Sequence, residues 1–138
     1  MVTLTSPATI RLAPYDRNPS VASANFLSTA VGPHGSTVRA TYTVPTARKA
    51  QVTCATVVVI RRTAATTPGT TFGVVNVGAA QFAIAWFTDN ALNVQYTDKH
   101  ETSGVIAATN TAVITTQDSS AAGTIDFAIL FSIAEFDA

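Results

Sequence analysis

The chain has 138 residues, which suits a single domain, and 47% of them are apolar. Only 12% are charged, about half the share of a typical globular protein, and eight basic residues balance eight acidic ones. The basic residues occur at most in pairs, and no apolar run approaches the ~20 residues of a membrane span. We therefore expect neither a nucleic-acid partner nor a membrane. A near-neutral surface favours association with other protein.

Residues 1–36 predict an extended N-terminal arm. Four prolines interrupt the segment, and no helical or strand period runs through it. Its apolar residues are too frequent for a disordered linker, so we expect them to contact a partner surface. The predicted contact residues are Ile10, Leu12, Tyr15, Phe26 and Leu27. The alternative is that the segment packs along its own domain. No basic stretch leads into an apolar core here, so a signal peptide is not expected.

Residues 37–138 predict a β-rich body that begins with two strands. In 37–44, apolar side chains alternate with polar ones, which indicates a half-buried strand with Val38 and Tyr42 on its apolar face. A turn follows at 45–49, and 50–63 predict a long strand rich in β-branched residues. From the alternation along this strand we expect two faces. One holds Val52, Cys54, Thr56, Val58 and Ile60, and the other holds Thr53, Ala55, Val57 and Val59.

The remaining sequence predicts further short strands separated by turns. They are expected at residues 72–77, 81–88, 92–97, 105–107, 112–116 and 124–136. A polar loop is expected at 98–104. Seven or eight strands at spacings of roughly 8 to 12 residues predict an all-β fold, a β-sandwich or jelly-roll-like body. The expected domains are therefore an arm at 1–36 and a β-sandwich at 37–138.

The sequence carries no enzymatic motif, so we expect no catalytic residue, no cofactor and no metal site. The single Cys54 excludes an internal disulfide, and its place in the middle of a strand predicts a buried thiol. The densest polar group is Asp98, Lys99, His100 and Glu101. Asp98, His100 and Glu101 are ligand types for a metal, but the chain supplies few further ligands, so we expect a charged hairpin tip instead. His34 stands in a flexible turn and is expected in solvent. A glycosidase pair that includes Asp126 depends on a spatial separation that sequence does not give.

Two interpretations stay open for Trp86, Tyr96 and Phe82: an aromatic platform for sugar, or one face of the core. Arg61 and Arg62 are consecutive in a strand, so their side chains point to opposite faces and do not form one phosphate clamp. We expect them to mark the exit of the strand into solvent, or to meet carboxylates of a partner.

One stretch resembles a known family. The run Tyr42-Thr43-Val44-Pro45, a basic turn with Arg48, Lys49 and Ala50, and a long β-branched strand ending in Arg61-Arg62-Thr63-Ala64-Ala65-Thr66-Thr67 are similar to small β-sandwich virion proteins of tailed bacteriophages. Head decoration (cement) proteins are the closest kind. The resemblance covers residues 41–71 and leaves out the arm.

This resemblance implies a structural protein of the virion rather than an enzyme. It implies a homotrimer on the capsid surface, made in the host cytoplasm, whose partner is the major capsid protein and which stabilises joints between capsid subunits. The alternative is a receptor- or carbohydrate-binding module of a phage tail or fibre, which predicts exposed aromatic residues.

Overall fold

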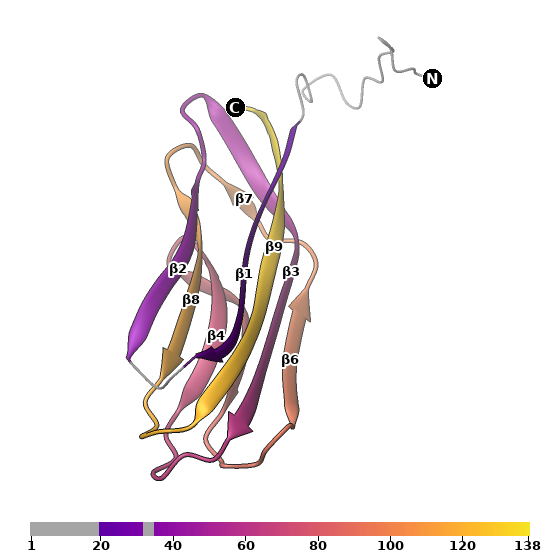
Figure 1. The fold of residues 1–138 in the computed structure, drawn as a ribbon. Helices are drawn as coiled ribbons and strands as arrows, with labels where there is room; N and C mark the ends of the chain where they lie inside the picture. The colour runs from indigo at the N-terminus through magenta and orange to yellow at the C-terminus, as the bar shows by residue number, and fades with distance from the viewer. Residues whose placement is uncertain (1–19, 32–34) are drawn as a thin grey trace.

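The computed structural model describes the backbone of residues 20–31 and the full residues 35–138 (Figure 1). These residues are all-β and contain no helix long and apolar enough to cross a membrane. The strands are β1 (Ser20–Val31), β2 (Ser36–Thr43), β3 (Arg48–Thr63), β4 (Thr71–Val77), β5 (Ala80–Phe87), β6 (Gln95–His100), β7 (Val105–Ile106), β8 (Thr111–Asp118) and β9 (Thr124–Asp137).

Two antiparallel sheets face each other (Figure 1). The five-stranded sheet has the order β1-β9-β3-β6, with β7 also paired to β3, and the four-stranded sheet has the order β2-β8-β4-β5. Every connection between consecutive strands crosses from one sheet to the other, except β4–β5 and β6–β7. Apart from the two-residue β7, eight strands therefore lie four to a sheet, in the arrangement of a jelly roll. The predicted all-β sandwich or jelly-roll class is confirmed.

The core lies between the sheets and is built from alternate positions of the strands. Every second side chain of a strand points inward, so a strand in each sheet supplies one row of buried residues. In β9 these are Ile125, Phe127, Ile129, Phe131 and Ile133, each at most 3% exposed. Facing them in β4, Gly73 leaves room for Ile129, because a Cβ at that glycine would lie 2.6 Å from Ile129 Cδ1.

Part of the predicted arm forms β1. Its backbone pairs antiparallel with β9 from Ser20, opposite Glu135, to Val31, opposite Ile125. Residues 20–31 thus lie along the sheet of their own domain, and residues 1–19 are outside the described residues. The division of the chain into an arm and a body at residue 37 stays a prediction.

A β-bulge in β3 changes the predicted faces. The pairing of β3 with β9 shifts register between Val52 and Cys54. The extra residue reverses the alternation, so Val52 points into the core together with Ala55 and Val57. Cys54 lies on the outer face and is only half-buried. The prediction that Cys54 is a core residue is therefore wrong.

One further strand, β2, differs from its predicted face. A register shift in β2 leaves Val38 outside the core, 61% exposed, whereas Tyr42 packs against the core cluster. In β5 the small residues Ala83 and Ala85 point inward with Phe87, so the bulkier residues between them face outward. β6 extends to His100, so the polar loop predicted at 98–104 begins three residues later than expected.

Candidate functional site

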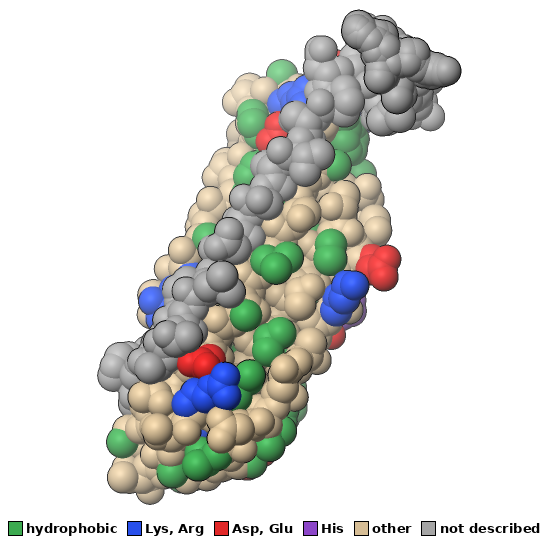
Figure 2. Space-filling model, turned by 45° about the vertical axis from the view of Figure 1, so that its right-hand side comes forward, with side chains coloured by type: hydrophobic (Ala, Val, Ile, Leu, Met, Phe, Trp, Pro, Cys, Tyr) green, Lys and Arg blue, Asp and Glu red, His purple; other side chains and the backbone are tan. Residues whose placement is uncertain are grey.

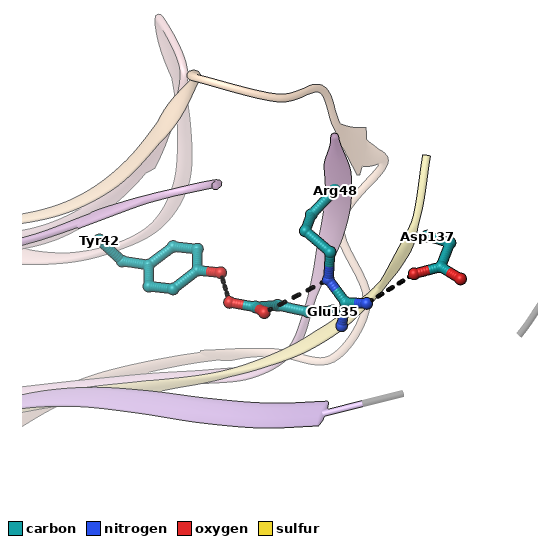
Figure 3. Close-up of polar contacts among 4 residues, drawn as sticks. All are labelled: Tyr42, Arg48, Glu135 and Asp137. Carbon is teal, nitrogen blue, oxygen red and sulfur yellow. Dashed lines mark hydrogen bonds and ion pairs between the residues drawn. The ribbon is translucent and has the colours of Figure 1, made fainter. Parts of the chain in front are cut away.

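A polar cluster joins the two sheets at the end of the sandwich where the chain terminates (Figure 3). The hydroxyl of Tyr42, on β2, donates to Oε2 of Glu135, on β9. Arg48 lies between two carboxylates, with Nε 3.7 Å from Glu135 Oε1 and Nη1 2.8 Å from Asp137 Oδ1. Burial, and then the hydrogen bond to Glu135, raise the pKa of the Tyr42 hydroxyl. The phenol therefore stays protonated, and the cluster serves to tie β2, β3 and β9 together.

A second polar cluster lies at the opposite end, beneath the loops that follow β3 and β8. Arg61 is fully buried, and its Nη2 donates to Ser120 Oγ at 2.8 Å and reaches Thr71 Oγ1 at 3.4 Å. The Thr71 hydroxyl donates to Asp118 Oδ1 at 2.7 Å. Among the residues that the structure describes, Arg61 Nε and Nη1 and Asp118 Oδ2 have no hydrogen-bond partner. The guanidinium also lies over the ring of Phe87, 5.1 Å from its centroid.

The buried Arg61 corrects the prediction for the arginine pair. Only Arg62 leaves the strand into solvent, where its Nε contacts Asp126 Oδ2 at 2.5 Å and its Nη1 donates to Asn93 Oδ1 at 2.9 Å. The two side chains do point to opposite faces, as predicted. Asp126 is therefore engaged by an arginine rather than set opposite a second carboxylate.

The group predicted around residue 98 does not form a metal centre. Asp98 Oδ2 lies 3.3 Å from His100 Nε2 and accepts the backbone N–H of Ile84 at 2.8 Å. Within the part of the chain that the structure describes, no three His, Cys, Asp or Glu side chains gather as metal ligands would. Asp98 and His100 lie on β6 rather than in the predicted hairpin tip. Their contacts connect β6 to the edge of β5.

The outer side of the four-stranded sheet is the candidate interaction surface. The pairing of its strands places six apolar residues on this side: Val38, Phe72, Val74, Ile84, Trp86 and Val113. We call these six residues, with the Thr, Asn and Gln residues between them, the uncharged face. Trp86 is 57% exposed and pairs across strands with Phe72. Val74 is 3% exposed although it points outward, so the apolar residues around it already form a packed layer.

The uncharged face carries no charge because of how its strands are composed. Among the residues of β2, β4, β5 and β8, only Arg39 and Asp118 are charged. Arg39 Nε donates to Thr116 Oγ1 at 2.8 Å, and Thr116 is buried between the sheets. Asp118 belongs to the buried network of Arg61. Both charged side chains therefore turn away from the face.

The structure separates the three aromatic residues for which two interpretations were open. Trp86 lies on the outside of the sheet, whereas Phe82 and Tyr96 pack against the core cluster. The Tyr96 ring lies 4.8 Å from that of Phe87, and its hydroxyl donates to Asp89 Oδ2 at 2.7 Å. This bond raises the pKa of Tyr96 and, with the N–H of Ala91, lowers that of Asp89. The three do not form one platform.

The predicted contact residues of the arm fall into two groups. Ile10, Leu12 and Tyr15 lie outside the described residues, as does His34. Phe26 and Leu27 belong to β1, where their backbones pair with those of Ile129 and Ala128. Their role as partner contacts stays a prediction.

No protein-family model and no curated protein matches the chain. Among solved structures, one of Desmodium yellow mottle tymovirus shares 12% sequence identity with it, covers 93% of both chains and gives a TM-score of 0.41. The infectious bursal disease virus VP2 subviral particle shares 9% identity over 89% of this chain and 38% of that chain, with a TM-score of 0.34. Both TM-scores are below 0.5, so the fold of this chain rests on its own strand order.

Proposed function

We propose that this chain is a structural protein of a virion and acts by binding other protein subunits. The observation that carries the proposal is the uncharged face, where Trp86 and Val38 are more than half exposed on a sheet surface without charge. The centres of protein interfaces are depleted in charge and enriched in aromatic residues, and exposed apolar patches mark such interfaces. A jelly roll suits this role, because viral capsid domains are among the proteins that use it.

The more specific part of the proposal is a decoration (cement) protein of a tailed-bacteriophage head. It is supported by the resemblance of residues 41–71, which includes the turn at Pro45. In this proposal the chain is made in the host cytoplasm, forms a homotrimer and binds the major capsid protein on the capsid surface, where it stabilises joints between subunits. Residues 1–36 would add contacts to neighbours through the apolar residues predicted for the arm.

We propose no enzymatic role. The buried polar atoms of Arg61 and Asp118 lie within the sandwich, and five of the accessible charged residues pair with one another: Arg48 with Glu135 and Asp137, and Arg62 with Asp126. An active site needs at least two convergent polar groups that reach a substrate. The two polar clusters connect strands instead, so their arrangement supports a scaffold.

The test of the proposed function is binding to capsid shells. Purified chain is mixed with shells assembled from the major capsid protein alone, the shells are sedimented, and bound chain is quantified. We expect saturable binding at a fixed ratio to the capsid subunit and a higher temperature of shell disruption. A chain that stays in the supernatant at every concentration would contradict the proposal.

A deletion tests the arm. Removing residues 1–19 keeps β1, whose pairing with β9 belongs to the fold. We expect the shortened chain to remain folded by circular dichroism and to bind shells more weakly. Undiminished affinity would show that residues 1–19 make no contact with the shell.

The exposure of Trp86 also favours a second candidate, a receptor- or carbohydrate-binding module of a tail or fibre. Lectin domains also use the jelly roll, and an exposed indole beside Phe72 offers a flat apolar surface on which a sugar ring packs. A glycan array distinguishes the candidates. Binding that is lost in Trp86→Ala would support this second function, and an array without any signal would count against it.

A further inference from the structure

We propose that the uncharged face is a self-association surface, and that its occupant is a second copy of this chain. The inference depends on the proposed function only in the expectation that copies of the chain associate. It adds which surface the copies use and names Trp86 as the residue buried when they meet.

The composition of the face indicates a partner surface that is itself uncharged. An ion brought against the face would lose hydration without gaining an opposite charge, which disfavours a charged partner. The same face on a second copy offers apolar and hydroxyl-bearing side chains and no ion. The chain also has equal numbers of acidic and basic residues, so two copies do not repel each other through net charge.

The outer side of the five-stranded sheet differs in this respect. Its pairing places Lys99 opposite Thr56, and Asp126 opposite Ile60, on the outer side of β3. Asp126 is bound there by Arg62. Figure 2 looks toward this side and shows Lys or Arg side chains next to Asp or Glu side chains near its margins. Association through this sheet would require charged groups to be desolvated.

Both edges of the four-stranded sheet carry features that oppose pairing through an edge, so copies would meet face to face. At β5 the backbone N–H of Ile84 is occupied by the carboxylate of Asp98. At β2 the register shift between Val38 and Ala40 breaks the regular strand. Bulges and capped amides of this kind discourage the addition of another strand. The exposed side chains of the face itself then remain as the contact.

The experiment uses the full chain and its single tryptophan. Sedimentation velocity over a wide concentration range gives the oligomeric state, and Trp86 emission reports on the face, because a buried indole emits at shorter wavelength than an exposed one. The disrupting variant is Val38→Lys, and the matched control is Val105→Lys on β7. The two valines are 61% and 60% exposed, so neither substitution disturbs the core.

We expect wild type and Val105→Lys to be oligomers with blue-shifted Trp86 emission, and Val38→Lys to dissociate at least tenfold more readily with emission shifted to the red. A wild-type chain that is monomeric throughout would overturn the inference, as would a Val38→Lys variant that associates like wild type. A monomer whose Trp86 emission shifts only when shells or glycans are added would also overturn it. That outcome assigns the face to another occupant, and binding of shells by such a monomer leaves the proposed function intact.

Discussion

Replacing Arg61 by methionine removes a fully buried cation and should lower the unfolding free energy strongly. The same substitution at the neighbouring Arg62 should have little effect. The Arg61 side chain holds the end of the sandwich together through Ser120 and Thr71, both of which also contact Asp118. Removing one partner of a buried charged network costs about 3–5 kcal/mol, because the remaining charge stays buried without compensation. That is a large share of the roughly 5–15 kcal/mol that stabilises a domain.

The control is Arg62→Met, whose side chain is 44% exposed and paired with Asp126 at the surface. Exposed ion pairs contribute about 0–1 kcal/mol, so this variant should unfold nearly like wild type. The assay is urea unfolding followed by far-ultraviolet circular dichroism.

A double-mutant cycle separates the network from simple loss of volume. Asp118→Asn should destabilise because it removes the buried negative charge that Thr71 and Ser120 connect to Arg61. The double variant Arg61→Met/Asp118→Asn should lose about 1–3 kcal/mol less than the sum of the single variants, since neither charge then remains. Equal costs for Arg61→Met and Arg62→Met, or strict additivity in the cycle, would refute the reasoning.

Three other predictions concern the packing, the backbone and the pH dependence. Gly73→Ala should lower the unfolding free energy by about 1–3 kcal/mol, because the added Cβ would lie 2.6 Å from Ile129 Cδ1. Ile129→Val removes that Cδ1, so the double variant should recover part of the loss. Additive losses on urea unfolding would contradict this. Thr109→Gly should raise the unfolding free energy by about 1 kcal/mol, because Thr109 has φ +69°, and an unchanged thermal midpoint would argue against strain there. The pKa of Tyr42 is higher in the folded chain than the unfolded value of 10.0. Its neutral hydroxyl therefore stabilises the fold fully below pH 10.0, and this stabilisation is lost as the pH rises through the folded pKa. Unfolding measured from neutral to strongly alkaline pH should show a steeper loss above pH 10 in wild type than in Tyr42→Phe, and equal slopes would exclude this role.

The strand pattern of the body follows from the sequence because alternation and turn residues are local signals. The long strand at 50–63 is an example: its β-branched run gives β3 almost to the residue. The strand order does not follow in the same way. Which strands become neighbours depends on contacts between distant segments, and β3 pairs with the last strand of the chain.

The predicted faces failed where a single residue changed the alternation. The bulge before Cys54 exchanges the inward and outward positions of β3, and no residue type at that point indicates a bulge. In β5, hydropathy alone does not decide whether the alanines or the larger apolar residues point into the core. The choice of Ala83 and Ala85 as inward residues depends on the space that the opposite sheet leaves.

The buried arginine was the most consequential residue that sequence reasoning misplaced. Arg61 follows Val57 and Val59 at a spacing of two, so the pattern already puts it on their buried face. The charge suggested solvent instead, because arginine is almost never fully buried unless it is paired. Its polar neighbours Thr71 and Ser120 come from other parts of the chain, and the sequence gives no sign that they meet it.

Electron cryo-microscopy of intact particles tests the central claim most directly. If the chain is a structural virion protein that associates through the uncharged face, density for the two-sheet body will appear on the outside of the shell at regular positions. In that density Trp86 and Val38 will be covered by a neighbouring copy. Particles that lack this density would contradict the claim, and bodies on the shell whose uncharged faces point into solvent would contradict the assignment of the face.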